Sequence, residues 1–357
     1  PGKAWLDYIT RSQFLLQHGE FGADVLVFAG NAMPNGAVHR KDLSAAGYGY
    51  DSCGTDILAE LTVDDGDLVL PSGKRYRLLV LPNHAFHTPA LARKLRGLVE
   101  AGATVLGPKP QHTPSLQDFP ASEEELRAIG EEVWGNCDGK AITSHRFGKG
   151  RVFAGLGAPE VLAQLGIPPA VHLPQGTAWI HRHTDHIDTF FVSNQSEAMI
   201  ETVAGFRATG RRPELWDAES GTIRPATGWI MNGARARVPL QLAPGKSIFV
   251  VFREPGQPAP DPVVRAEGPA HDPVLPTLDS TQGARLRATH NGNHTLHHAS
   301  GKTKQLEVSG LPAPLPLAGP WTVRFQTDRG EPESARFDKL IPWNEHPDQG
   351  IRHFSGT

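Results

Sequence analysis

The chain has 357 residues, of which 39% are hydrophobic and 20% are charged, so it is long enough for two or three globular domains. Its formal net charge of -3 excludes a global basic field that would attract nucleic acid. The only cysteines, Cys53 and Cys137, exclude a disulfide scaffold and have no CxxC spacing for zinc. No apolar run approaches the ~20 residues needed to span a membrane.

The two ends of the sequence suggest a piece of a larger protein. The chain starts at Pro1 without a methionine or a signal-peptide pattern. It stops at Thr357, just as a strand-like segment begins. We therefore expect further sequence on both sides, and these ends do not reveal the compartment.

Residues 1–168 predict an α/β domain. An apolar helical repeat runs from Trp5 to Leu16, and further helices are expected at 56–61 and from Pro89 to about residue 101. Short apolar runs of the buried-strand type lie at 24–28, 77–82, 103–107 and 150–155. Alternating strands and helices predict a mainly parallel, doubly wound sheet of the flavodoxin-like or amidotransferase-like kind.

The remaining sequence is typical of all-β structure. Residues 169–256 contain short aromatic and β-branched runs between turn residues, which predicts a β-sandwich. We expect residues 257–312 to form a proline-rich linker and a small β segment, with a hairpin turn at Asn291-Gly292. Residues 313–357 then begin a further β-sandwich that the chain does not complete.

A thiol-dependent amidotransferase would need a cysteine on a tight strand-to-helix turn, activated by a histidine. Cys53 has no strong strand before it, and Cys137 lies in a polar loop. We expect the domain to lack its nucleophile.

Two loop segments are candidates for ligand binding. Asn83, His84 and His87 follow a predicted strand, and ligands of doubly wound sheets bind beyond the carboxyl ends of strands; the alternative is a polar loop. Tyr48, Tyr50 and Asp51 combine aromatic rings with a carboxylate, which suits a sugar site, whereas the alternative is a loop whose tyrosines fill a domain interface.

Two polar segments look catalytic or metal-binding but have structural explanations. His181, Arg182, His183, Asp185, His186 and Asp188 lie in an extended stretch, where neighbours point to opposite faces, so we expect a polar hairpin edge and no metal site. Glu214 and Asp217 could form a carboxylate pair of the kind that glycoside hydrolysis needs. Both sit on one short β segment, and we expect them to stabilise a turn.

An ordered set of segments resembles the α-L-rhamnosidases of glycoside hydrolase family 106. The matching segments are 5–19, 23–28, 49–51, 67–82, 180–182, 191–195, 213–217 with Gly221, and 247–252. Each is weak alone, but the order is preserved along essentially the whole chain. The segments 319–343 and 353–356 resemble the start of the galactose-binding-like β-sandwich of family 2 and related glycosidases.

The resemblance implies an N-terminal (β/α)8 barrel with two catalytic glutamates and a calcium ion, hydrolysis with inversion, and a chain that begins where the barrel ends. It therefore implies no catalytic residue, cofactor or metal ligand in this chain, and an intramolecular contact with the barrel. The family segment Gly-Tyr-Asp-Tyr-Asp has glycine at Gly49 in this sequence, in place of the first aspartate. Export to the periplasm or the cell exterior is expected from this kind of enzyme.

Besides the thiol-dependent amidotransferase, the sequence leaves two alternative functions. The first is the non-catalytic downstream part of an α-L-rhamnosidase acting on plant or microbial glycans. The second is a non-enzymatic glycan-binding scaffold that uses exposed tryptophans on one β face. The candidates for that face are Trp179, Trp216, Trp229, Trp321 and Trp343.

Overall fold

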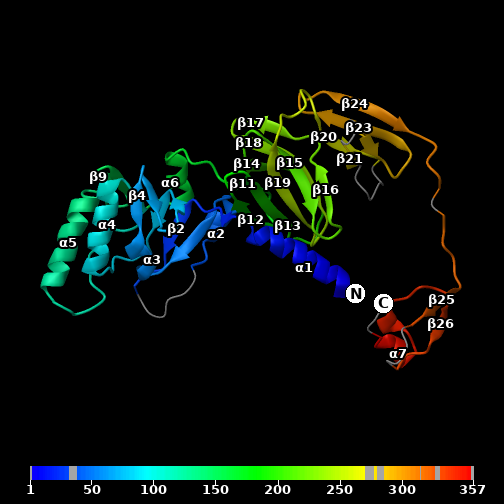
Figure 1. Cartoon of the computed structure of the whole chain (residues 1–357), viewed down its shortest axis with the longest axis horizontal. Helices are drawn as coiled ribbons and strands as arrows, with labels where there is room; N and C mark the ends of the chain where they lie inside the picture. The colour runs from blue at the N-terminus through cyan, green and yellow to red at the C-terminus, as the bar shows by residue number, and fades with distance from the viewer. Residues whose placement is uncertain are drawn as a thin grey trace.

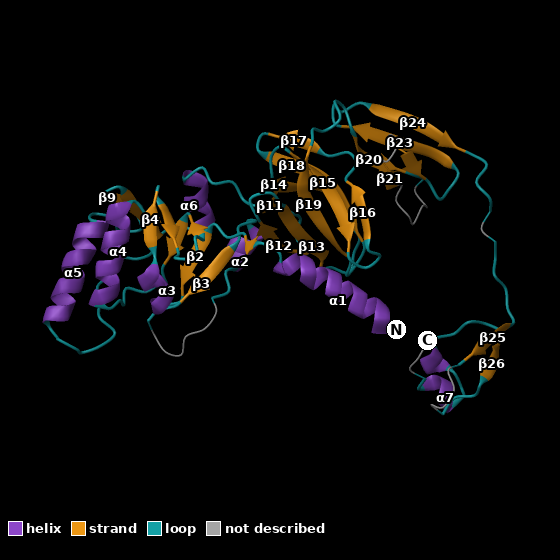
Figure 2. Ribbon diagram, in the orientation of Figure 1, coloured by secondary structure: helices purple, strands orange, loops and turns teal. Residues whose placement is uncertain are grey.

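The computed structural model describes residues 2–31, 38–269, 277–279, 285–313, 315–325 and 330–354. An α/β unit lies at one end of an elongated molecule, a β-sandwich lies in the middle, and smaller sheets follow (Figure 1). An extended segment leads to the C-terminal strands (Figure 2). Among the described residues, no helix is long and apolar enough to cross a membrane.

The α/β unit is built on a six-stranded sheet whose strands are all short and largely buried. In spatial order they are β3 (Tyr50–Cys53), β2 (Val25–Phe28), β7 (Leu78–Val80), β8 (Thr104–Leu106), β10 (Gly150–Phe153) and β9 (Ser144–Phe147). The first five are parallel and β9 is antiparallel to β10. Counted along the chain, the parallel strands have the order 2-1-3-4-5. A separate meander contains β4 (Thr62–Asp64), β5 (Asp67–Val69) and β6 (Arg75–Tyr76).

Helices cover both faces of this sheet because successive strand residues point to opposite sides. Leu26 and Phe28 of β2 face a core shared with α3 (Thr55–Glu60), α4 (Pro89–Ala101) and α5 (Ala121–Trp134). Val25 and Val27 face a second core with α2 (Lys41–Ala45) and α6 (Ala158–Gln164). The helix α5 was not predicted from the sequence.

Two antiparallel sheets form the central sandwich. One contains β1 (Glu20–Phe21), β12 (Thr177–His183), β13 (Asp188–Asn194), β19 (Ser247–Pro255), β15 (Arg211–Asp217) and β16 (Thr222–Pro225). The other contains β11 (Val171–His172), β14 (Ile200–Arg207), β18 (Arg235–Leu242) and β17 (Ile230–Asn232). Their shared core includes Phe190, Phe206 and Phe252, which are fully buried and contact one another. An aromatic core between two sheets is what the alternating pattern predicted.

The first helix, α1 (Gly2–Gln17), belongs with the sandwich, although the sequence grouped residues 1–168 as one α/β domain. Its residues Tyr8, Leu15 and Leu16 pack against Phe249 and Val251 of β19. The adjoining strand β1 pairs with β12 in the sandwich. The helical repeat shows that a helix has an apolar face, but the repeat cannot show which sheet that face covers.

The segments after the sandwich form small sheets. One joins β20 (Val263–Glu267), β23 (Gly292–His298) and β24 (Thr303–Val308), and β21 (Thr277–Asp279) pairs with β22 (Arg285–Arg287). The predicted hairpin turn at Asn291-Gly292 is wrong, because Gly292 is the first residue of β23, and β23 pairs with β24. The Asn291 side chain instead accepts a hydrogen bond from the backbone of Leu311 at 2.9 Å.

The C-terminal elements are β25 (Trp321–Arg324), β26 (Ser334–Phe337), the 3-10 helix η1 (Trp343–Glu345) and α7 (Gln349–Arg352). They pack around Phe325, Phe337 and Ile351. Residues 355 and 356 of the 353–356 segment lie outside the described part of the chain.

Candidate functional site

Of the three predicted sugar-binding residues, Tyr48 and Tyr50 line one groove, and Asp51 does not. Tyr48 is buried, and its hydroxyl donates to the carbonyl of Ile167 at 2.9 Å. This burial agrees with the alternative to sugar binding, in which the tyrosine fills an interface. Tyr50 and Asp51 are neighbours on the edge strand β3, where successive side chains point to opposite faces.

Tyr50 lines a groove of about 680 Å³ between the α/β unit and β12 of the sandwich. We call this the junction groove. Its aromatic residues are Phe21, Tyr50 and Trp179, from three different strands, and the buried Tyr48. The Trp179 indole donates to the carbonyl of Ser44 at 3.3 Å, which ties the sandwich to α2 across the groove.

Basic side chains form another wall of the junction groove, namely His39, Arg40 and Lys41. The backbone N–H of Arg40 donates to the Tyr50 hydroxyl at 2.9 Å, which fixes the phenol. The Arg40 guanidinium forms a two-nitrogen contact with Asp42, and this hydrogen bonding raises the pKa of Arg40 and lowers that of Asp42. Aromatic faces beside hydrogen-bonding groups suit a sugar ring, whose C–H faces are apolar and whose edges are polar.

Asp51 does not line the junction groove. Its carboxylate pairs with the Lys74 ammonium and accepts a hydrogen bond from the Tyr76 hydroxyl at 2.9 Å. The ammonium also lies 5.4 Å from the ring centre of Phe21 and 5.6 Å from that of Tyr76. Burial, followed by the Asp51 charge, raises the pKa of Tyr76, so its hydroxyl remains a donor. Asp51 therefore holds β3, β6 and β1 together.

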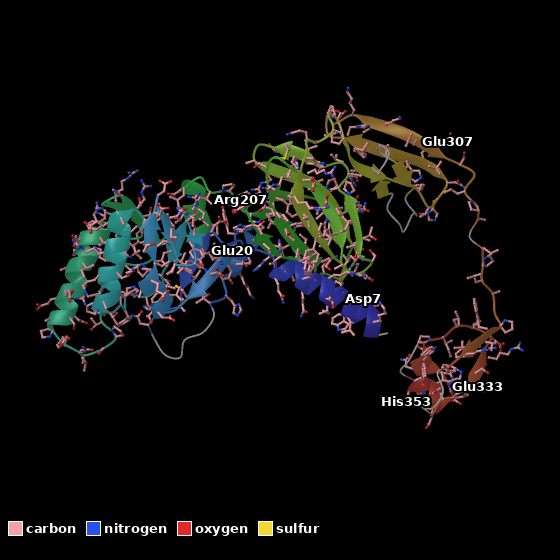
Figure 3. The ribbon with its side chains drawn as sticks, in the orientation of Figure 1. Asp7, Glu20, Arg207, Glu307, Glu333 and His353 are labelled. Carbon is pink, nitrogen blue, oxygen red and sulfur yellow. The ribbon has the colours of Figure 1, made fainter. Side chains whose placement is uncertain are left out.

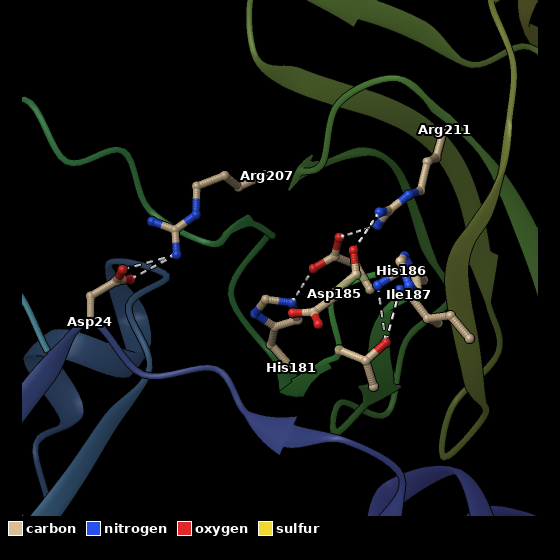
Figure 4. A network of polar contacts seen from close by, with 9 residues as sticks. Asp24, His181, Asp185, His186, Ile187, Arg207 and Arg211 are labelled. Atoms are coloured by element: carbon tan, nitrogen blue, oxygen red, sulfur yellow. Dashed lines mark hydrogen bonds and ion pairs between the residues drawn. The ribbon is translucent and has the colours of Figure 1, made fainter. Parts of the chain in front are cut away.

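Histidine-rich β12 and β13 form a polar hairpin edge, as the sequence predicted (Figure 4). The Nε2 of His181 lies 3.0 Å from Oδ1 of Asp188, and its ring stacks on Phe190 with centroids 4.2 Å apart. Arg211 pairs with the other oxygen of Asp188 at 3.3 Å. Across the described residues, no group of three or more His, Cys, Asp or Glu side chains could hold a metal ion.

The candidate ligand-binding histidines that follow β7, His84 and His87, differ in their exposure to solvent. His84 is partly exposed and its ring lies 5.8 Å from that of His87, measured between centroids. His87 is fully buried, and neither ring nitrogen has a hydrogen-bond partner among the described residues. Burial, with a smaller contribution from His84, lowers the pKa of His87 to about 4. A neutral, buried His87 cannot contact a ligand.

The two thiols are free, buried and protonated. The structure corrects one expectation, because Cys53 ends strand β3 and helix α3 begins at Thr55, so it does lie on a strand-to-helix turn. Burial, together with Asp56 and Asp51, raises the pKa of Cys53 to about 12. Burial also raises the pKa of Cys137. A thiol held in this form is a poor nucleophile at neutral pH.

Both acids were expected to stabilise a turn, and only Asp217 does so; Glu214 instead has partners within the sheet. Glu214 is buried and accepts hydrogen bonds from the Trp216 indole at 2.8 Å and from Arg253 at 3.0 Å. Asp217 accepts from the backbone N–H of Glu219 at 2.9 Å, which stabilises the turn between β15 and β16.

Sequence reasoning missed the junction groove as a unit. Phe21, Arg40 and Trp179 come from distant parts of the chain, and only packing of the sandwich against the α/β unit brings them together. Trp179 was singled out from the sequence only as a member of a hypothetical exposed tryptophan face. No local motif links these residues.

Comparison with known proteins finds relatives that are named as glycosidases. A family described as alpha-L-rhamnosidase, glycoside hydrolase family 106, matches residues 2–229. A protein of Formosa agariphila named "Putative beta-glucuronidase" is 36% identical over 253 residues, which is 71% of this chain and 21% of that protein. The solved structure of a rhamnosidase from Novosphingobium sp. PP1Y is 30% identical with a TM-score of 0.72, and covers 99% of this chain and 30% of that one.

The chain thus spans about a fifth of the length of the curated relative and under a third of the solved one. The fold is a multidomain, mostly β arrangement of the rhamnosidase kind. The family match covers well over half of the residues, including both sides of the junction groove. This chain belongs to the α-L-rhamnosidase family of glycoside hydrolases.

Proposed function

We propose that this chain is the non-catalytic downstream part of a longer glycoside hydrolase, an inverting α-L-rhamnosidase that acts on plant or microbial glycans. Membership of the family and the short share of each relative that the chain spans support this proposal. The acids considered above also support it, since Asp51, Glu214 and Asp217 each have cationic or backbone partners.

In the longer protein, inversion needs one protonated carboxyl to assist the leaving group and one carboxylate to activate water on the opposite face of the sugar. We assign both carboxyls to a (β/α)8 barrel outside this chain, together with any calcium ion. Among the described residues, no group of three or more His, Cys, Asp or Glu side chains could hold a metal ion, which supports this assignment.

The single observation that carries a role for this chain is the junction groove. Phe21, Tyr50 and Trp179 present aromatic side chains there, beside the basic wall at His39, Arg40 and Lys41. We propose that the groove closes one side of the sugar pocket, with the rings against C–H faces and the basic groups at hydroxyls.

The contact with the barrel is assigned to the outer face of α1. Leu6 is 63% exposed and Phe14 is 70% exposed, while Tyr8, Leu15 and Leu16 on the opposite side of the helix pack on the sandwich. Large apolar side chains gathered on one exposed face are typical of a surface that another part of a protein covers.

Two finer fold assignments accompany this proposal. The order 2-1-3-4-5 of the parallel strands supports a flavodoxin-like α/β unit. For residues 313–357 we retain the start of a galactose-binding-like sandwich, which the β25–β26 pair supports. We also propose that the longer protein acts in the periplasm or outside the cell, where polymeric glycans are found.

The glycan-binding scaffold is less well supported. None of its five tryptophans is exposed: Trp179 and Trp229 contact the sandwich core, Trp216 packs near α1, and Trp321 and Trp343 contact the C-terminal cluster. They therefore do not form one flat face for stacking on a glycan.

The experiment compares the isolated 357-residue chain with the full-length protein on an aryl α-L-rhamnoside. We expect turnover only by the full-length protein. Turnover by the isolated chain at a comparable rate would contradict the assignment of the catalytic carboxyls to another region, and an inactive full-length protein would contradict the rhamnosidase assignment.

A further inference from the structure

The α/β unit contains a second pocket, different from the junction groove. Its volume is about 970 Å³, and its walls come from residues that follow β2, β7, β8 and β10. We call it the carboxyl-end crevice. It spans the boundary between β2 and β7, where the strand order reverses, and in open parallel sheets this boundary is where ligands bind.

The floor of the carboxyl-end crevice is apolar. Phe28, Val80 and Leu106 occupy the ends of three adjacent parallel strands and line the pocket. Polar side chains stand at the rim, each from a loop anchored on the sheet or on α5. This combination of apolar floor and few polar groups is typical of a small-molecule site.

Four rim side chains have no partner among the residues that the structure describes. Within the described residues, the amides of Asn83, Gln111 and Asn136 and the ammonium of Lys140 make no hydrogen bond or ion pair, and all four line the crevice. An amide can both donate and accept, which matches a sugar hydroxyl. The three amides therefore favour a polyhydroxylated ligand.

The other charged groups of the crevice already have partners among the described residues. The Lys109 ammonium lies 3.0 Å from the carboxylate of Glu131 and donates to the carbonyl of Gly135 at 2.6 Å. The Asp138 carboxylate accepts from the backbone N–H groups of Lys140 and Ile142, at 2.8 and 2.9 Å. Arg40 is paired with Asp42. Among the described charged side chains that line the crevice, Lys140 is therefore the one without a partner, while the Asp138 carboxylate keeps its charge but is bound by its own loop.

The loop that carries Asn136 and Lys140 is held in place before any ligand binds. Its Asp138 hydrogen bonds close the loop on itself, and Gly139 contacts Gly155 at the exit of β10. Gly155 has φ of +73°, and a Cβ there would collide with the carbonyl of Gly139. A rigid loop loses little entropy when it binds a ligand.

We propose that the carboxyl-end crevice binds an acidic saccharide, a small sugar with hydroxyl groups and one carboxylate. The amides of Asn83, Gln111 and Asn136 bind the hydroxyls, and Lys140 binds the carboxylate. One unpaired ammonium can form one charge-assisted contact with a carboxylate, whereas the Asp138 carboxylate in the same crevice would repel the greater negative charge of a phosphate.

The test measures binding to the intact 357-residue chain by isothermal titration calorimetry, at low ionic strength and neutral pH. The three probes are galacturonate, galactose and galactose 1-phosphate, which share one ring and differ in charge. We expect saturable binding of galacturonate, with an affinity at least about fivefold higher than that of galactose, as one charge-assisted contact provides.

The variants separate the two kinds of contact. Lys140→Gln is expected to lower the galacturonate affinity about fivefold and to leave galactose within about twofold, while Asn136→Ala weakens both. Lys149→Gln is the matched control, since Lys149 is an exposed lysine at the opposite edge of the same sheet, in the β9–β10 turn.

Several results would overturn the proposal: no saturable binding of any probe, equal affinity for acid and neutral sugar, tighter binding of the phosphate, or equal effects of the Lys140 and Lys149 substitutions. The measurement involves no turnover. It therefore stands or fails separately from the rhamnosidase assignment.

Discussion

Asp24 and Arg207 join the α/β unit to the sandwich through one nitrogen, since Nη2 of Arg207 donates to both carboxylate oxygens of Asp24, at 2.9 and 3.0 Å (Figure 4). Arg207 lies at the junction of the two units (Figure 3). Its Nη1 also donates to the carbonyl of Pro168 at 2.7 Å, in the connecting segment. The pair therefore fixes the relative position of β2 and β14.

Replacing Arg207 by leucine leaves the largely buried Asp24 carboxylate without its cation. We expect the free energy of unfolding to fall by about 1–3 kcal/mol, less than for a fully buried pair because Arg207 is partly exposed. Urea denaturation of Arg207→Leu, Asp24→Asn and the double variant gives the coupling energy. Additive effects of the two changes would contradict the coupling.

Trp179→Ala in the full-length protein tests the junction groove. If the indole contacts the sugar, kcat/KM on an aryl α-L-rhamnoside should fall about tenfold, since one aromatic contact contributes roughly 1–2 kcal/mol. Trp216→Ala is the control, because Trp216 lies in the sandwich away from the groove. A decrease of the same size in both variants would show a general loss of packing and not a lost sugar contact.

His87 should make stability depend on pH. Its folded pKa of about 4 lies below the unfolded value near 6.5, so the unfolded chain binds more protons between these values. Stability is therefore full above about pH 6.5 and falls as the pH decreases toward 4, by at most about 3 kcal/mol.

His87→Leu should flatten that part of the profile when the free energy of unfolding is measured by chemical denaturation from pH 4.5 to 7.5. His186→Leu, at an exposed histidine, is the control. An unchanged slope in His87→Leu would mean that His87 is not the group responsible.

The thiols of Cys53 and Cys137 should be unreactive in the native protein. Both are buried and burial raises both pKa values, so little thiolate is present at pH 8. We expect iodoacetamide to label neither residue natively and both in denaturant, as measured by intact mass. Rapid native labelling of Cys53 would reopen thiol chemistry at the β3–α3 turn.

Local sequence was sufficient for most strands of the α/β unit and the sandwich. The apolar runs at 24–28, 77–82 and 150–155 correspond to β2, β7 and β10, because a strand buried on both faces must be continuously apolar. The helix α5 was missed, since its buried positions are interrupted by glutamates such as Glu123 and Glu124.

The sequence also predicted the histidine-rich hairpin and the turn at Asp217, but the expected acid partner of Arg182 is replaced by backbone carbonyls of residues 17–19. In both cases alternation along a strand limits which neighbours can converge, and this argument needs no tertiary information. The prediction of a hairpin turn at Asn291-Gly292 was wrong. These two residues are a common turn sequence, but in the structure Gly292 begins the strand β23, which pairs with β24.

The sequence by itself determined the family, the alternation of strands and helices in the first half, and the change to all-β structure near residue 170. Only the tertiary structure decided that α1 covers the sandwich, that Tyr50 and Asp51 face opposite sides of β3, and that Trp179 meets Tyr50 in the junction groove. The reason is physical: periodicity specifies which side of an element is buried, but its partner depends on how separate elements pack together.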